Sequence, residues 1–211
     1  MPLKLVTINV RGLSSSKKAD VVLHELERLP YDLFLLQETH VSCKERADCI
    51  AKKWRGNCFW SFGVGRSAGV AIFVSPSFAG TVSRFLVDTD GRVLSVLVQL
   101  GNTTLNIVNI YAPNTVSDRK IFLENLHLYF LSSSRLIAGD LNCVDNALDR
   151  LNPVVTFLRT RVFKLFCLIC HWLMFGGKIT LVAFLTLALI VLKLLGWIVF
   201  LFLVIYLSLF P

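Results

Sequence analysis

The sequence predicts an α/β sandwich over about the first 150 residues, with helices packed over largely antiparallel sheets. Three observations predict this fold class. Apolar segments follow one another in a mixed order, namely strand, helix, strand, helix, several consecutive strands, helix and strand. Several of the strands end abruptly in acids, amides or hydroxyls, and the composition of the chain changes after Pro153.

Strands are expected where short apolar or β-branched runs are bounded by turn residues. These runs cover residues 3–10, 31–38, 57–63, 67–75, 80–88, 92–100, 103–114 and 134–140. Helices are expected at 17–29, where apolar residues share one face and Pro30 follows, at 44–54, and at 118–131 with Asp118 near the start. The segment 89–91, Thr-Asp-Gly, predicts a hairpin turn.

The net charge of +8 is unevenly distributed. Up to Pro153 the chain has 17 basic and 14 acidic residues, whereas the residues after it include five basic side chains and no acid. The high charge is therefore a weak indication of nucleic acid, because a basic flank beside apolar segments is also typical of membrane segments. Six cysteines without a regular framework predict free thiols, and Cys167 and Cys170 are interpreted as buried small residues.

Residues 154–211 form an apolar tail that we separate from a domain at 1–153. The run 179–210 is interrupted only by Lys193. Since about 20 apolar residues span a bilayer, we expect one long or two shorter transmembrane helices here, with the lipid bilayer as a partner. Basic residues on the N-terminal side of the last apolar run would then keep residues 1–153 in the cytosol.

Four strands of the first 153 residues end in groups that suit phosphodiester hydrolysis. Mg²⁺ prefers one or two carboxylates and keeps several waters, which Glu38 with Asn9 would supply. Asp140 would orient or deprotonate the attacking water, and Tyr111 would donate a hydrogen bond to charge developing at phosphorus.

Asn142 would fix a phosphate or the Asp140 side chain through hydrogen bonds. The spacing supports this pairing, because alternation along an extended segment places residues 140 and 142 on the same face. Taken singly, each of these residues could equally be an ordinary turn or packing residue.

Five blocks together resemble the endonuclease/exonuclease/phosphatase family. The blocks are TINVRGL, LFLLQETH, SAGVAIFV, NIYAPN and IAGDLN. They are most similar to the apurinic-type endonuclease domain of the reverse-transcriptase polyproteins of LINE-type retrotransposons, over about residues 3–150. The resemblance implies a four-layer, DNase I-like α/β sandwich, Mg²⁺ or Mn²⁺ as cofactor, a DNA substrate and a nuclear location if the tail does not insert into a membrane.

The resemblance also implies a role for each matching residue. Asn9 and Glu38 match the first metal-site positions and Tyr111 the active-site tyrosine. Asp140 and Asn142 match the catalytic acid and its amide partner. Asn114 lies in the block of the tyrosine, and we assign it at most a supporting role in binding substrate.

The C-terminal side departs from the family pattern. Family members continue for about another third of the domain, with a later acid and a closing Ser-Asp-His element. Here no acid follows Asp149, and His171, the only later histidine, lies in an apolar segment. His40 lies near Glu38 but in the wrong block to replace the missing histidine. We therefore expect a domain that is incomplete at its C-terminal side and has weak or no activity.

Three functional hypotheses remain open at this point. The first is a metal-dependent DNA endonuclease derived from a retroelement. The second is a catalytically inactive fragment held at a membrane by its tail. The third is a phospholipid or inositol-phosphate phosphodiesterase, because the family includes such enzymes and fold alone does not decide the substrate.

Overall fold

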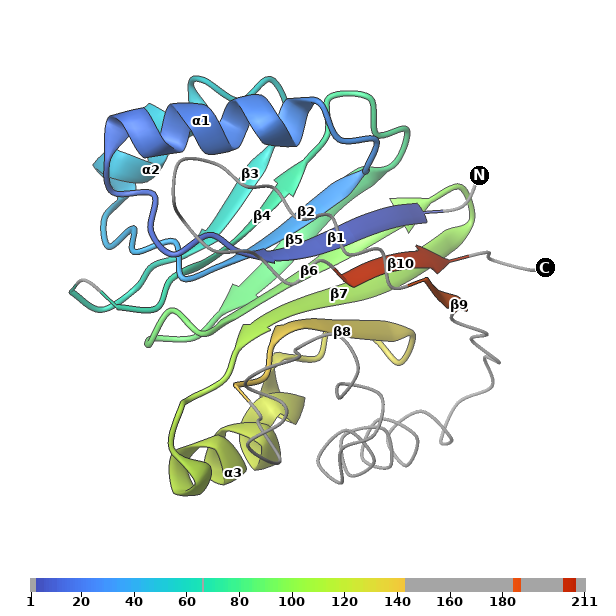
Figure 1. Ribbon diagram of the computed structural model, residues 1–211. Helices are drawn as coiled ribbons and strands as arrows, with labels where there is room; N and C mark the ends of the chain where they lie inside the picture. The colour runs from blue at the N-terminus through green and yellow to red at the C-terminus, as the bar shows by residue number, and fades with distance from the viewer. Residues whose placement is uncertain (1–2, 66, 143–183, 187–202, 208–211) are drawn as a thin grey trace.

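Two stacked β-sheets with helices on their outer faces form the body of the protein (Figure 1). The computed structural model describes residues 3–65, 67–142, 184–186 and 203–207. The elements in chain order are β1 (Leu3–Asn9), α1 (Ser16–Glu27), β2 (Leu33–Gln37), α2 (Lys44–Ala51), β3 (Cys58–Ser61), β4 (Val70–Val74), β5 (Thr81–Val87), β6 (Val93–Leu100), β7 (Thr103–Tyr111), α3 (Val116–Asn125), the 3₁₀ helix η1 (Leu126–Tyr129), β8 (Arg135–Asp140), β9 (Phe184–Thr186) and β10 (Leu203–Leu207).

The first sheet, sheet A, has the strand order β3-β4-β2-β1-β10-β9. Its central pair, β1 and β2, is parallel, and Asn9 lies opposite Gln37 at the end of the pair. The other neighbours are antiparallel. Because parallel strands end at the same edge of a sheet, the residues that follow β1 and β2 emerge side by side.

The second sheet, sheet B, has the strand order β5-β6-β7-β8. The predicted hairpin joins β5 to β6, and its turn is closed by Asp88, whose carboxylate accepts hydrogen bonds from the main-chain nitrogens of Arg92 and Val93. β7 and β8 are parallel, and Tyr111 lies opposite Asp140 at the end of this pair. In sheet B, as in sheet A, a parallel pair of strands therefore ends with polar residues side by side at one edge of the sheet.

Three apolar clusters hold these layers together. One packs α1 and α2 against sheet A, the second fills the space between the sheets, and the third packs α3 and η1 against sheet B. Phe34 and Phe73 lie in the first cluster, Leu35 and Ile107 in the second. Alternate residues of the same strand thus face different layers, as the two-residue period of a strand requires.

Within 3–142 the structure confirms the predicted mixed α/β arrangement and its largely antiparallel sheets. The third helix begins two residues before the predicted start. Its N-cap is Thr115, whose side chain accepts a hydrogen bond from the nitrogen of Asp118. Its last predicted turns form the tighter η1, a common ending for a helix.

In the apolar tail, the prediction of helices is wrong at residues 184–186 and 203–207, which are the strands β9 and β10. β10 pairs antiparallel with β1, with Leu5 opposite Ile205, and so covers an edge of β1 that would otherwise leave main-chain groups unpaired. The prediction failed because a continuous apolar run has no period that distinguishes a strand from a helix.

In the described part of the chain, no helix is both long and apolar enough to cross a membrane. The helices expected at 154–183 and 187–202 lie outside the described residues, as do Cys167, Cys170 and His171.

Candidate active site

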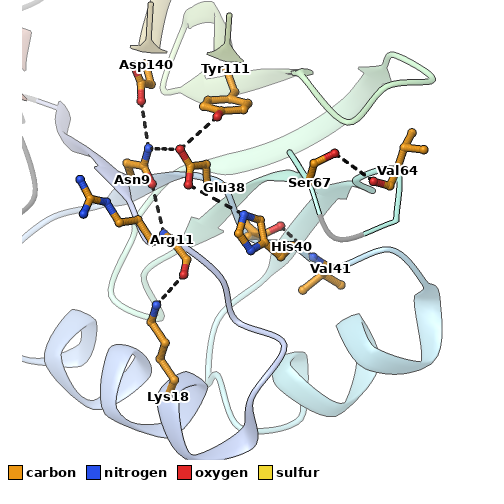
Figure 2. Close-up of polar contacts among 11 residues, drawn as sticks. Asn9, Arg11, Lys18, Glu38, His40, Val41, Val64, Ser67, Tyr111 and Asp140 are labelled. Atoms are coloured by element: carbon orange, nitrogen blue, oxygen red, sulfur yellow. Dashed lines mark hydrogen bonds and ion pairs between the residues drawn. The ribbon is translucent and has the colours of Figure 1, made fainter. Parts of the chain in front are cut away.

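The predicted site residues come from the ends of four strands, two in each sheet. Asn9 ends β1 and Glu38 directly follows β2, while Tyr111 ends β7 and Asp140 ends β8. The stacking of the sheets brings these two polar edges together, and Figure 2 shows the four side chains pointing toward one another. Residues separated by as much as 131 positions in the chain are therefore neighbours.

One amide connects the two acids of this cluster. Asn9 Nδ2 donates to Glu38 Oε1 at 2.8 Å and to Asp140 Oδ2 at 2.9 Å, and the phenol of Tyr111 donates to the same Glu38 oxygen at 3.0 Å (Figure 2). Neutral donors thus separate two carboxylates that would otherwise repel each other. The arrangement holds both acids in fixed positions at the edge shared by the sheets.

The main chain around the site is strained. Glu38 has a φ of 51°, and Arg11, His40 and Asn142 also lie in the left-handed region that disfavours side chains with a Cβ. Main-chain bonds hold the Glu38 conformation, including the bond from Gly12 N to Glu38 O at 2.6 Å. Such conformations cost about 1–3 kcal/mol each and concentrate at functional sites. Their clustering here supports a functional role for this edge.

Tyr111 is held in its neutral form. Burial, followed by the charge of Glu38 and the hydrogen bond to it, raises the pKa of Tyr111 to about 12. A hydrogen bond with the side chain of Asn142 acts in the opposite direction but is outweighed. At neutral pH the phenol is therefore a hydrogen-bond donor.

Asn142 lies beside Asp140, but not for the reason given by the sequence. Strand β8 ends at Asp140, and Asn142 has a φ of 49°, so the segment is not extended. A turn brings the two together, with Asn142 N donating to Asp140 Oδ1 at 3.0 Å. The Asn142 side chain donates to the oxygen of Ala112 at 2.7 Å, and Arg119 donates to the main-chain oxygen of Asn142 at 2.9 Å.

The residue before Asp140 is Gly139, and the structure shows why it must be glycine. Its φ is 141°, and a Cβ at this position would lie 2.0 Å from the oxygen of Ile110 on β7. The close approach of the two strands aligns Asp140 with Tyr111. Only glycine permits both the conformation and the approach.

Asn114 and His40 lie at the border of the cluster. Asn114 is exposed, and its main-chain oxygen accepts a hydrogen bond from Arg119 at 3.0 Å, so its role toward substrate stays a prediction. His40 Nε2 lies 3.8 Å from Glu38 Oε2, on the side of Glu38 that faces away from Asn9 (Figure 2).

The donors at this edge fit a hard, hydrated cation. In the ranges that the structure describes, no group of three or more His, Cys, Asp or Glu side chains is arranged to hold a metal. Mg²⁺ and Mn²⁺ accept oxygen donors, and Mg²⁺ needs only one or two carboxylates, of which Glu38 would be one. Asn9 turns its NH₂ toward both acids, and its Oδ1 accepts from Arg11 N at 3.1 Å. Its amide would have to rotate before it could offer oxygen to a metal beside Glu38.

Sequence reasoning missed the buried polar residues behind the site. Gln37 is 1% exposed and Asn109 is fully buried, and their side chains join the two sheets. The signal was present, because both are amides inside strands that are otherwise apolar, and buried polar groups must find partners.

The family model for the endonuclease/exonuclease/phosphatase family matches residues 6–187. The chain belongs to the endonuclease/exonuclease/phosphatase family. This confirms the resemblance found in the sequence. The match extends past residue 153 and includes β9, so the division of this family member into 1–153 and 154–211 stays a prediction.

The relatives of this endonuclease/exonuclease/phosphatase family member include a transposon protein. The chain is 31% identical over 157 residues to the transposon TX1 uncharacterized 149 kDa protein of Xenopus laevis, and the match covers 72% of the chain but only 12% of that protein.

Solved structures share the fold. An AP endonuclease from Archaeoglobus fulgidus matches with a TM-score of 0.53 and 19% identity, over 70% of this chain and 60% of the other. The 3′ phosphatase NExo from Neisseria, bound to product DNA hairpin, matches with a TM-score of 0.50 and 20% identity over the same shares.

Proposed function

We propose that this chain hydrolyses phosphodiester bonds of DNA in a reaction that depends on Mg²⁺ or Mn²⁺, as a retroelement-derived endonuclease of the apurinic/apyrimidinic or exonuclease III type. One observation carries the proposal. Asn9, Glu38, Tyr111 and Asp140 form a single hydrogen-bonded cluster built from both sheets. A cluster of two fixed acids, a neutral phenol and an amide contains groups that phosphodiester hydrolysis uses.

Each residue has a defined role in this proposal. Asp140 orients the attacking water and accepts its proton, and Asn142 N holds the acid through its bond to Oδ1. Tyr111 stays protonated, and when substrate binds its single proton turns from Glu38 to an oxygen of the phosphate on which negative charge develops. Glu38 with Asn9 would hold the cation, which, when bound, stabilises charge on the phosphoryl oxygens.

Positive charge beside the cluster supports an anionic substrate. Arg11 N donates to Asn9 Oδ1 at 3.1 Å, and Lys18 Nζ donates to the main-chain oxygen of Arg11 at 2.5 Å (Figure 2). Arg92 lies over the ring of Tyr111, with its Cζ 5.2 Å from the ring centre. Cations at the rim of a site attract phosphate groups. Family membership and the transposon-encoded relative favour DNA as the molecule that carries these phosphate groups.

We expect the turnover to be low. Residues 150–211 contain no acid, so they supply no Asp-His pair like that of the family's closing element. Catalytic groups that act together are not additive, and losing one removes most of the rate.

The test is nicking of supercoiled plasmid DNA by the full chain with Mg²⁺, with Mn²⁺ and with a chelator. We expect slow nicking that needs the cation and is abolished in Glu38→Gln and in Asp140→Asn. The matched controls are Glu25→Gln and Asp48→Asn, which neutralise acids paired with Arg28 and Lys44 on surface helices.

Two results would overturn the proposal. If the wild-type chain nicks plasmid DNA no faster than the Glu38→Gln, Asp140→Asn double variant does, the chain is catalytically inactive. Turnover of phosphoinositide vesicles, with no cleavage of plasmid or abasic DNA, would move the same chemistry to a lipid substrate.

A further inference from the structure

A buried polar bridge joins the two sheets directly behind the proposed site. Gln37 Nε2, on β2 of sheet A, donates to Asn109 Oδ1 on β7 of sheet B at 2.7 Å. The same nitrogen also donates to Thr7 Oγ1 at 2.8 Å and to the oxygen of Leu35 at 3.0 Å, so its two hydrogens are shared among three acceptors. Gln37, Asn109 and Thr7 are all buried. We call these three residues the inter-sheet bridge.

Asn109 extends the bridge to a second strand of sheet A. Its Nδ2 donates to the oxygen of Leu36 on β2 at 3.0 Å and to the oxygen of Ala71 on β4 at 2.9 Å. One side chain of sheet B is thereby fixed to two strands of the opposite sheet. Hydrogen bonds weaken steeply away from their best length and angle, so few relative placements of the sheets satisfy this set.

Most of the remaining contact between the sheets does not specify their placement in this way. It consists of aliphatic and aromatic side chains such as Leu35, Val96 and Ile107. Hydrophobic attraction is nearly non-directional and tolerates small displacements. The inter-sheet bridge therefore supplies the buried side-chain hydrogen bonds between the layers. The bonds of the site itself, from Asn9 to Asp140 and from Tyr111 to Glu38, also cross between the sheets but are only partly buried.

The position of the bridge in the sequence links it to the site. Gln37 directly precedes Glu38, Thr7 lies two residues before Asn9, and Asn109 lies two residues before Tyr111. Residues two apart on a strand share a face, so Thr7 and Asn109 lie on the same inner surface as Asn9 and Tyr111. Glu38 follows the end of β2 with a φ of 51°, and its carboxylate is held by bonds from Asn9 and Tyr111 on that surface. A shift of the bridge would change the separation of Glu38 from Tyr111 and Asp140.

We propose that Gln37, Asn109 and Thr7 are positioning residues that set the distance between the sheet A half and the sheet B half of the site. The inference about turnover rests on the proposed function, whereas the inference about geometry does not. The bridge residues touch no substrate and act through Glu38, Asn9 and Tyr111.

The same strand offers a matched control. Asn106 is also fully buried on β7, but it faces away from sheet A. Its Nδ2 donates to Ser95 Oγ at 2.7 Å and to the oxygen of Val96 at 3.0 Å, and its Oδ1 accepts from Leu131 N at 3.0 Å. Asn106 and Asn109 thus make equivalent numbers of buried bonds, and only those of Asn109 cross to sheet A.

The experiment compares Asn109→Leu with Asn106→Leu in the full chain. One readout is the side-chain amide resonances of Asn9, which donates to an acid of each sheet. The other is the nicking of plasmid DNA, resolved into kcat and KM. We expect Asn109→Leu to shift the Asn9 resonances and to lower kcat on the order of 100-fold with little change in KM, because a misplacement near 1 Å has an effect of that size.

Asn106→Leu should destabilise the fold to a similar degree, while the Asn9 resonances and the kcat of the folded protein stay near those of the wild type. Should Asn109→Leu fail to fold, Thr7→Val removes a single hydroxyl of the bridge at nearly constant volume and should shift the same resonances. The double variant Gln37→Asn, Asn109→Gln exchanges the two amides of the bridge. Its kcat should lie above the kcat of either single variant, Gln37→Asn or Asn109→Gln.

The proposal is overturned if the bridge variants leave the Asn9 resonances unchanged, or if they move kcat no further than Asn106→Leu does. A wild-type chain that cleaves no DNA would refute the proposed function instead. The Asn9 resonances would then still decide whether the bridge sets the geometry.

Discussion

Tyr111 donates a hydrogen bond to Glu38 across the two sheets, with 3.0 Å between the phenol oxygen and Oε1. The two residues are 73 positions apart in the chain. The same carboxylate oxygen accepts from Asn9, so Glu38 is held by one donor from each sheet. The phenol is therefore a structural partner of the proposed metal-site acid, and its single proton would have to turn from Glu38 to the phosphate when substrate binds.

Replacing Tyr111 with phenylalanine should lower the single-turnover nicking rate on the order of 100-fold, because a donor to the developing charge is lost. Glu38 keeps its bond to Asn9, so the fold should remain intact by circular dichroism. Tyr129→Phe removes a phenol from η1, away from the cluster, and should leave the rate unchanged. Equal rates for both variants would remove Tyr111 from the chemistry.

The stability of the chelator-treated protein should decrease between about pH 10 and 12. Because the pKa of Tyr111 is raised from its usual 10 to about 12, the folded state binds this proton more tightly than the unfolded state does. The contribution is fully present below pH 10 and is lost as the pH rises through 12. Burial also raises the pKa of Cys58 from its usual 9.0 to about 12, so this thiol adds a loss of stability that begins near pH 9.0.

Tyr111→Phe isolates the contribution of the tyrosine. Urea unfolding at pH 8, 10 and 11.5 should show a shallower decrease for the variant than for the wild type. Parallel curves would mean that the phenol titrates equally in the folded and unfolded chains.

Gly139→Ala should destabilise the fold by about 3 kcal/mol or more, since a left-handed alanine is strained and its Cβ would meet Ile110 O at 2.0 Å. Gly101→Ala is the matched control, because Gly101 also has a positive φ but no atom lies within 4 Å of its Cβ position. Its cost should be about 1–2 kcal/mol, measured by urea unfolding. Similar values would show that β8 has room to move away from β7.

Asn9→Asp should lower the melting temperature in a chelator and increase the stabilisation by Mg²⁺. The new carboxylate cannot donate to Glu38 or Asp140, so three acids would repel one another until a cation binds. Thermal unfolding with and without Mg²⁺ measures both effects. Asn102→Asp, an exposed change in the turn between β6 and β7, should show neither effect. A Mg²⁺ response equal to that of the wild type would place the cation away from Asn9.

Much of the fold could be predicted from the sequence because hydrophobic period and turn residues act locally. Strands such as β2, and the start of α3 near Asp118, are determined by neighbouring residues. The pairing of β10 with β1 was not predictable, since a uniformly apolar run has no period and its partner lies about 200 residues away.

The candidate site was predictable in composition but not in arrangement. Polar residues at the ends of apolar strands identified Glu38 and Asp140. The Asn9 amide between the two acids and the bridge from Gln37 to Asn109 depend on how the sheets stack. Those contacts join distant segments, and no local pattern encodes them.

The bond between Asn9 and Asp140 has a consequence for the timing of activity during synthesis. These residues are 131 positions apart, so the ribosome makes Asn9 on the order of ten seconds before Asp140. Until the later strand emerges, the N-terminal half of the cluster has no counterpart. A nascent chain therefore lacks the complete cluster, and the proposed activity can begin only after residue 140 has left the exit tunnel and the sheets have docked.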